Sequence, residues 1–163
     1  ALSMGASGVW VGTRFVACKE ADAGPYHKNA IVQASHHDTI RTLIYSGRPA
    51  RVLNTPFVND WMTNRMEEQK KWLSEGKIPV PFRNESSGVD PLPKDADPKE
   101  WFARRGWPMG QVAGSIDSIE SAKDIIDDMV KVAVHQLSQA STMIDMQTKS
   151  ETSTMVSLPS ARL

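Results

Sequence analysis

The residues best suited to chemistry lie near the start of the chain, in the run Trp10-Val11-Gly12-Thr13. The apolar residues from Val9 to Val11 are typical of a strand that is buried on both faces of a parallel sheet. Ligands of parallel sheets and barrels bind beyond the carboxyl ends of strands, where Gly12 and Thr13 would lie. A glycine there lets backbone amides approach a phosphate, and a threonine adds a hydroxyl donor. The run therefore predicts a phosphate site, although a simple turn at Gly12-Thr13 would explain the same residues.

Three other groups have suitable residue types but a plainer explanation. The run His36-His37-Asp38 could suggest a metal or acid–base cluster, but adjacent side chains point in different directions, which favours a polar surface turn. Arg48 and Arg51 could bind an anion, yet arginines in ordered loops more often tie carbonyls and carboxylates together. Cys18 precedes a lysine and a glutamate whose charges cancel, so nothing nearby would stabilise a thiolate. We expect all of these residues to be structural or inert.

The elements that must position the candidate site follow from hydrophobic spacing and from glycine and proline. Gly5 suits the left-handed position that ends a helix. Helical spacing of apolar residues predicts helices, β-branched and aromatic residues predict a strand, and Gly76 would end a helix. The expected order is a helix in His27–Ser35, a strand over residues 39–45, a helix over Pro56–Leu73 and a proline-rich, mostly irregular stretch over 77–108.

The segment 116–137 gives the clearest pattern in the chain. Apolar residues recur on one face at helical spacing, which predicts an amphipathic helix that buries a stripe. Asp117 and Glu120 would lie near the positive end of its dipole, and His135 near the negative end. We therefore interpret these three residues as favourable dipole partners and assign them no chemistry.

The composition is that of an ordinary globular protein. The 163 residues are 40% hydrophobic and 23% charged, enough for one domain with a sizeable core. Lys+Arg and Asp+Glu both number 19, so the net charge gives no footprint for nucleic acid or an anionic membrane surface. The single cysteine excludes an internal disulfide and fits a reducing compartment, so we expect a cytoplasmic protein. No apolar run reaches the ~18 residues of a membrane span.

Three ordered motifs carry a resemblance to a known family. The string ALSMGASGVWVGTRF is similar to the stretch around the eighth barrel strand of nitronate monooxygenases, formerly called 2-nitropropane dioxygenases. YSGRPARVLN follows at the distance the family shows, and GQVAGSI with IESAKDIIDDMV resembles the end of the family's chain. Any one motif alone would be weak, but the three together, spread over residues 1–137, are specific.

The resemblance implies an α/β fold: a C-terminal fragment of a TIM (β/α)₈ barrel with an added helical and irregular segment. It implies FMN as cofactor, with the flavin phosphate held by main-chain amides and a hydroxyl of Trp10, Val11, Gly12 and Thr13. Gly110-Gln111 matches a family element that lies near the cofactor. The partners implied are a small alkyl nitronate and O2, which give a carbonyl compound and nitrite; neither nucleic acid nor a membrane is expected.

The chain also departs from the family pattern. A barrel of this type needs about 200 residues or more, and this sequence contains one convincing barrel strand. The resemblance places the glycine pair after strand seven, and the family's general-base histidine, ahead of Ala1. None of the four histidines here matches that motif. We therefore assign no catalytic residue, expect the native polypeptide to extend upstream, and expect this portion alone to be inactive.

Two alternatives to a nitronate monooxygenase stay open. One is a related flavin enzyme on the same barrel, such as an enoyl-acyl-carrier-protein reductase, with similar phosphate and Gly-Gln elements. The other is a non-catalytic barrel fragment that packs on a partner and binds no flavin. Oligomeric state is not predicted by any of these readings.

The end of the chain is expected to differ from the rest. Residues 138–163 are rich in serine and threonine and predict a disordered tail after the barrel portion of residues 1–137. The last three residues, Ala161-Arg162-Leu163, resemble the small-basic-leucine address of peroxisomal proteins. A peroxisomal location is thus a second hypothesis beside the cytoplasm.

Overall fold

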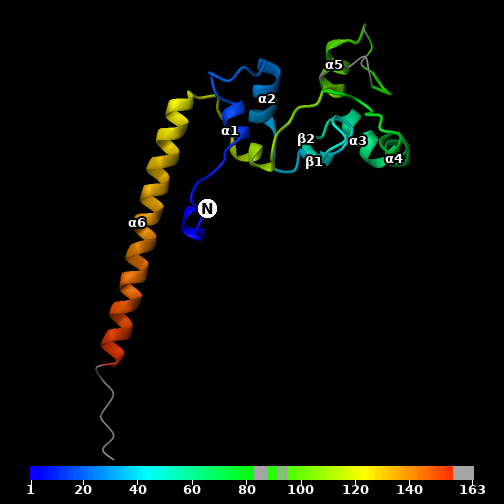
Figure 1. Cartoon of the computed structure of the whole chain (residues 1–163). Coiled ribbons are helices and arrows are strands. Elements are labelled where there is room, and N and C mark those ends of the chain that lie inside the picture. Colours follow the sequence, from blue (N-terminus) through cyan, green and yellow to red (C-terminus); the bar gives the residue numbers. More distant parts are fainter. Residues whose placement is uncertain (83–87, 92, 94, 156–163) are drawn as a thin grey trace, which may run out of the picture. The chain divides into compact units, whose positions relative to one another are not determined.

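A computed structural model describes residues 1–82, 88–91, 93 and 95–155, with side chains described as far as residue 142. The chain forms two compact units, one of Ala1–Val9 with Ser121–Leu163 and the other of Trp10–Glu120. The elements are the 3-10 helices η1 (Leu2–Met4) and η2 (Gln111–Ser115), the strands β1 (Thr39–Thr42) and β2 (Ala50–Leu53), and the helices α1 (Thr13–Val16), α2 (Pro25–Gln33), α3 (Pro56–Thr63), α4 (Met66–Ser74), α5 (Pro98–Arg104) and α6 (Ala122–Met155) (Figure 1). No helix in the described part of the chain is long and apolar enough to cross a membrane.

A narrow β-ribbon forms the centre of the Trp10–Glu120 unit. Strands β1 and β2 pair antiparallel, with Ile40 opposite Val52 and Arg41 opposite Arg51. The residues before Gly110 pair with the other edge of β2: the Leu53 amide donates to the Trp107 carbonyl at 3.0 Å, and the Met109 amide to the Arg51 carbonyl at 3.2 Å. The strand predicted over residues 39–45 is confirmed for Thr39–Thr42 and ends before Leu43.

Two hydrophobic cores lie on the two faces of this ribbon, because successive side chains along a strand point to opposite faces. One core contains Met109 and Trp107 and has Leu53 packed against it. The other contains Val52 and has Ile40 packed against it. The first core comprises Ala17, Ala30, Ile31, Trp107, Met109, Ala113 and Ile116, and the second Ile44, Tyr45, Val52, Val58, Trp61 and Val80.

Proline starts three of the helices. Its missing amide and fixed φ suit the first helical position, which Pro25, Pro56 and Pro98 occupy in α2, α3 and α5. In α5 the carboxylate of Asp97 also caps the amides of Lys99 and Glu100, both at 2.8 Å. The helix predicted from His27 is confirmed by α2. The stretch 77–108, predicted to be mostly irregular, contains the helix α5, because Asp-Pro there begins a helix.

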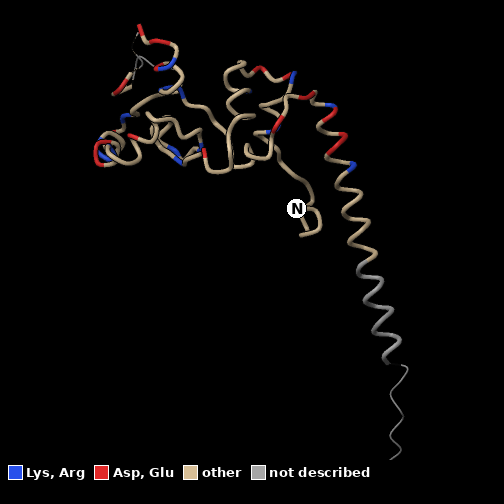
Figure 2. The backbone as a smooth tube through the Cα atoms, turned by 180° about the vertical axis from the view of Figure 1, so that it is seen from behind, with Lys and Arg blue, Asp and Glu red and all other residues tan. Residues whose placement is uncertain are grey.

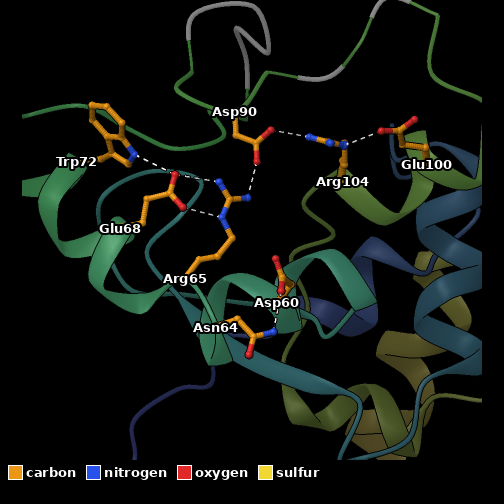
Figure 3. Close-up of polar contacts among 8 residues, drawn as sticks. All are labelled: Asp60, Asn64, Arg65, Glu68, Trp72, Asp90, Glu100 and Arg104. Carbon is orange, nitrogen blue, oxygen red and sulfur yellow. Dashed lines mark hydrogen bonds and ion pairs between the residues drawn. The ribbon is translucent and has the colours of Figure 1, made fainter.

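The helix predicted over Pro56–Leu73 is two helices, α3 and α4, with a break at Asn64 and Arg65. The amide of Asn64 donates to the Asp60 carbonyl at 2.8 Å and ends α3. The guanidinium of Arg65 then turns toward two carboxylates, Glu68 at 2.8 Å and Asp90 at 2.6 Å (Figure 3). Local propensity would continue the helix, so these side-chain contacts account for the break. Gly76 is left-handed at φ 72° and follows α4, as expected of a stop.

Asp90 connects α4 and α5 through two arginines. Its carboxylate accepts from Arg65 at 2.6 Å and from Arg104 at 2.8 Å, and Arg104 also binds Glu100 at 3.0 Å (Figure 3). Burial alone would raise the pKa of Asp90, but the two arginine hydrogen bonds and charges outweigh it and lower the pKa below 3.8. The ionised form of Asp90 therefore stabilises the fold.

Asp90→Asn is expected to destabilise the Trp10–Glu120 unit at neutral pH by about 1–3 kcal/mol, because two charge-assisted bonds lose their anion. The folded pKa lies below the unfolded one, so the stabilisation is present above the unfolded pKa and is lost as the pH falls through the folded value. The difference between the two proteins in urea unfolding should thus shrink below about pH 4. Asp95→Asn, an exposed change in the same segment, is the control and should stay within about 0.5 kcal/mol. If the difference in stability between the wild type and Asp90→Asn did not change with pH, this role of the ionised Asp90 would be contradicted.

The last helix differs from its predicted bounds at both ends. It begins at Ala122 and not at residue 116, because Ser121 caps it: the Ser121 hydroxyl accepts the Asp124 amide at 3.1 Å and donates to the Asp124 carboxylate at 2.5 Å. Asp117 and Glu120 precede the helix, and Ile116 is buried in the first core. The predicted dipole role of these two acids is therefore wrong.

Helix α6 also continues to Met155, where a disordered tail was expected from residue 138. No glycine or proline occurs between Gly114 and Pro159, and serine and threonine lower helix propensity only modestly. His135 is consequently inside the helix and not at its negative end, which corrects its predicted role. The tripeptide Ala161-Arg162-Leu163 lies outside the described residues.

Candidate functional site

The candidate phosphate residues occur at the start of α1. Gly12 is the residue before the helix, and its carbonyl accepts the amides of Phe15 at 2.9 Å and Val16 at 3.2 Å. The amides of Thr13 and Arg14, at the first helical positions, have no acceptor among the described residues. A Cβ added to Gly12 would meet nothing within 4 Å, so the backbone there is open to approach. Unpaired amides and an open backbone suit an incoming anion.

The strand predicted for Val9, Trp10 and Val11 is absent from the described structure. Val9 is 65% exposed and Trp10 is 99% exposed, where burial on both faces was expected. A strand exists only when neighbouring strands take up its amides and carbonyls. No described segment pairs with these residues, and their apolar side chains are therefore left exposed.

Thr13 and Gly110 come together although 97 positions separate them. The Gly110 amide donates to the Thr13 hydroxyl oxygen at 2.9 Å. A Cβ on Gly110 would be 3.4 Å from the same oxygen, so a side chain there would crowd it. Gln111 follows at the start of η2, with an exposed side chain. The structure thus places Gly110-Gln111 beside Thr13, while the side chain of Trp10 extends into solvent.

The side chain of Arg14 ties α1 to Ser118 and Glu120, a role that nothing in the sequence pattern indicated. Its guanidinium donates to the Ser118 carbonyl at 2.8 Å and to the Glu120 carboxylate at 2.7 Å. The Lys19 amide adds a bond to the Glu120 carbonyl at 2.8 Å. Glu120 is therefore an anchor for the turn that carries Thr13. Buried Cys18 sits next to this anchor as a free thiol, consistent with the inert role expected.

The turn that contains His36-His37-Asp38 contacts η2, the element that follows Gly110. The Asp38 carboxylate accepts the Ser35 amide at 2.7 Å, and this hydrogen bond lowers the pKa of Asp38. His36 Nε2 lies 3.0 Å from the Ser115 hydroxyl at the end of η2. The polar surface turn predicted here is confirmed, and it packs against the element that follows Gly110. No group of three or more potential metal ligands occurs in the described part of the chain.

His27 of α2 is half-buried and contacts the segment that leads to Gly110. Its Nε2 lies 2.8 Å from the Pro108 carbonyl, and since a carbonyl only accepts, Nε2 must carry the proton. Burial lowers the pKa of His27, as does the charge of Arg105, although the Pro108 bond raises it. The imidazole is thus held neutral and supports the strand-like segment leading to Gly110. We assign it a structural role.

The donors at Thr13 and Gly110 define the chemistry available here. Neutral amides and one hydroxyl bind an anion without transferring a proton, and none of these groups is an acid or base near neutral pH. Arg51, the other expected structural residue, donates from Nη1 to the carbonyl and hydroxyl oxygens of Thr39, both at 3.2 Å. These neutral donors can accept an anionic group as a hydrogen-bond partner, and they include no proton-transfer group.

Comparison with known proteins places the chain in a family. The family model of nitronate monooxygenase matches residues 1–131. The chain therefore belongs to the nitronate monooxygenase family of oxidoreductases, with an α/β fold. The resemblance seen in the three sequence motifs is confirmed.

Individual relatives agree with that assignment. A protein of Mycobacterium tuberculosis with a provisional monooxygenase name is 30% identical over 145 residues, which is 85% of this chain and 36% of the relative. A Bacillus subtilis protein named as a probable nitronate monooxygenase is 37% identical over 84 residues, 52% of this chain and 22% of the relative. The structure of FabK from Thermotoga maritima matches with a TM-score of 0.60 and 31% identity, over 87% of this chain and 42% of that one. The chain spans less than half the length of each.

Proposed function

We propose that the chain is the C-terminal portion of an FMN-dependent nitronate monooxygenase barrel and supplies part of the flavin phosphate site. The observation that carries this proposal is the 2.9 Å hydrogen bond from the Gly110 amide to the Thr13 hydroxyl. It joins two motifs that the family resemblance assigned separately to the cofactor. A turn that merely reversed the chain at Gly12 would not require a partner so distant in sequence.

The donors available at this place suit a phosphate. Because the Thr13 oxygen accepts from Gly110, its own proton is free to be donated to an anion. The amides of Thr13 and Arg14, which lack acceptors among the described residues, add two more donors. Gly12 presents no side chain to obstruct them. Three neutral donors around an open backbone are the arrangement that phosphate groups use in loop sites.

When bound, the flavin would supply the redox chemistry by accepting electrons from the nitronate and passing them to O2. The residues of this chain would fix the phosphate end and thereby the position of the ring system. Gly110 and the side chain of Arg14 act indirectly: Gly110 orients the Thr13 hydroxyl, and the Arg14 guanidinium ties the turn to Glu120. The exposed Val9 and Trp10 would become one strand of the barrel once neighbouring strands pair with them. We assign no residue of this chain as the catalytic base.

Thr13→Val is expected to weaken FMN binding about tenfold, because valine keeps the shape of threonine but removes the hydroxyl donor. The measurement is quenching of flavin fluorescence during titration with the purified chain. Thr63→Val is the matched control, since Thr63 is an exposed threonine of α3 whose hydroxyl bonds only its own helix, at the Asn59 carbonyl. Equal affinity of the wild type and Thr13→Val, or no FMN binding at all, would contradict the proposed site.

The likeness to FabK favours one second candidate, a flavin-dependent enoyl-acyl-carrier-protein reductase. Both candidates use the same phosphate anchor, so cofactor binding cannot separate them. We would assay a full-length protein that carries this chain as its C-terminal portion with an alkyl nitronate and O2, and separately with NADH and an enoyl thioester. Nitrite release with the first pair supports the proposal, and NADH oxidation with the second alone supports the reductase.

A further inference from the structure

Two arginines face each other across the β-ribbon. Arg41 of β1 is the direct partner of Arg51 of β2, so both side chains project from the same face. Like charges in directly opposed positions of a ladder are unfavourable. Figure 2 shows basic and acidic residues interspersed along the backbone. This like-charge pairing destabilises the sheet in the absence of a bound anion and therefore needs an explanation.

Neither arginine forms an ion pair with a carboxylate in the part of the chain that the structure describes. Arg51 is partly occupied, since its Nη1 donates to two oxygens of Thr39. That contact fixes the guanidinium and leaves Nε and Nη2 to bind another group. Arg41 is exposed, and no hydrogen bond from its side chain occurs among the described residues. The pair therefore combines one pre-positioned donor and one adaptable donor.

The arginine pair lies on the same side of the ribbon as the candidate phosphate site. The Met109 amide bonds the Arg51 carbonyl at 3.2 Å, which places Met109 beside Arg51 on the ribbon. Gly110 is the next residue, and it binds Thr13. A row of neighbouring positions thus leads from Arg41 through Arg51 and Met109 to the phosphate turn. The arginine pair is thus connected to the phosphate turn through adjacent positions of the ribbon.

We propose that Arg41 and Arg51 bind the oxyanion of the substrate, a small planar anion with two oxygens on one atom such as an alkyl nitronate or a carboxylate. The inference rests on the proposed function for the identity of the substrate, and on the ribbon geometry for the site. The planar guanidinium fork matches two coplanar oxygens and binds them bidentately. A phosphate dianion at this place is the competing occupant, and the test below separates the two.

The test uses the whole 163-residue chain without flavin and follows the arginine Nε–H signals by NMR during titration with isobutyrate, and separately with inorganic phosphate. Isobutyrate is the carboxylate that matches the nitronate of 2-nitropropane in shape. We expect saturable shifts with isobutyrate, and about tenfold weaker binding in Arg41→Gln, since each charge-assisted bond contributes strongly. Arg48→Gln is the matched control: it removes the same charge from the exposed hairpin turn, and it should change the affinity less than about twofold.

Equal weakening in Arg41→Gln and Arg48→Gln would show general charge attraction and overturn the proposal. So would the absence of saturation with isobutyrate. A repeat with FMN present identifies the occupant: displacement of isobutyrate by FMN and by inorganic phosphate would assign the pair to the cofactor phosphate and overturn the substrate role. These readouts are independent of the Thr13→Val titration, so failure of this subsite and failure of the flavin site are distinguishable.

Discussion

Trp61→Ala is expected to destabilise the Trp10–Glu120 unit by about 3–5 kcal/mol, the range found when a large aromatic side chain is removed from a packed core. Trp61 is completely buried in the core that also contains Val52 and Val58. Its ring in addition lies under the Arg65 guanidinium, 3.6 Å from the centroid. Alanine would leave a cavity beneath the residue that separates α3 from α4. The measurement is urea unfolding followed by far-UV circular dichroism.

Trp61→Phe provides the matched comparison. The indole Nε1 of Trp61 is buried and has no hydrogen-bond partner among the described residues, so phenylalanine loses no polar contact. The smaller ring should therefore cost about 1–1.5 kcal/mol. If phenylalanine destabilised the protein as strongly as alanine, the explanation by cavity volume would be wrong and a polar role of the indole would have to replace it.

Gly114→Ala is expected to destabilise the protein by about 2–3 kcal/mol through overpacking. A Cβ at this position would lie 2.3 Å from the His36 amide nitrogen and 2.4 Å from its Nδ1. A backbone nitrogen cannot move aside as the end of a flexible side chain can, so either η2 or the turn at His36 must shift. The shift would also break the contact of His36 with the Ser115 hydroxyl.

Gly24→Ala is the control for Gly114→Ala. Gly24 precedes α2 with φ −60°, and a Cβ there would meet nothing within 4 Å. Gly24 is the N-cap of α2, so alanine there changes the cap but creates no clash, and it should alter stability by less than about 1 kcal/mol. Urea midpoints compare the two variants directly. A stable Gly114→Ala protein would show that η2 does not pack on the His36 turn as described, and would weaken the support of Gly110.

Much of the local structure followed from the sequence because it is decided locally. The left-handed Gly5, the helix α2 and the strand that begins at Thr39 depend on residues within a few positions of each other. Two local signals were passed over: Asp97-Pro98, which starts α5, and Ser121 with Asp124, which start α6. Both are ordinary capping patterns, so these errors were avoidable.

Other features could not be predicted because distant contacts decide them. The break between α3 and α4 depends on Asp90, which binds Arg65 from 25 positions away. The apolar run at Val9–Val11 has the composition of a buried strand, but composition does not supply the neighbouring strands that it needs. Tertiary contacts overrode propensity in both cases.

The candidate site was predictable in part. Gly12 and Thr13 stood out by their types and spacing, whereas Gly110 and Gln111 came from family resemblance alone. The bond between Thr13 and Gly110 needed the structure, since 97 positions separate the two residues. Arg51 was considered as an anion ligand together with Arg48 and interpreted as structural, whereas its pairing with Arg41 becomes visible only through the register of β1 and β2.

The central claim is that Thr13 and the amides beside it hold the phosphate of the flavin. Riboflavin and FMN differ only in that phosphate, so comparing their affinities for the wild-type chain and for Thr13→Val isolates the contact. We predict that the wild type binds FMN about tenfold or more tightly than riboflavin, and that Thr13→Val reduces this preference while riboflavin binding stays the same. Equal affinity of the wild type for the two flavins, or a preference that Thr13→Val leaves intact, would contradict the account.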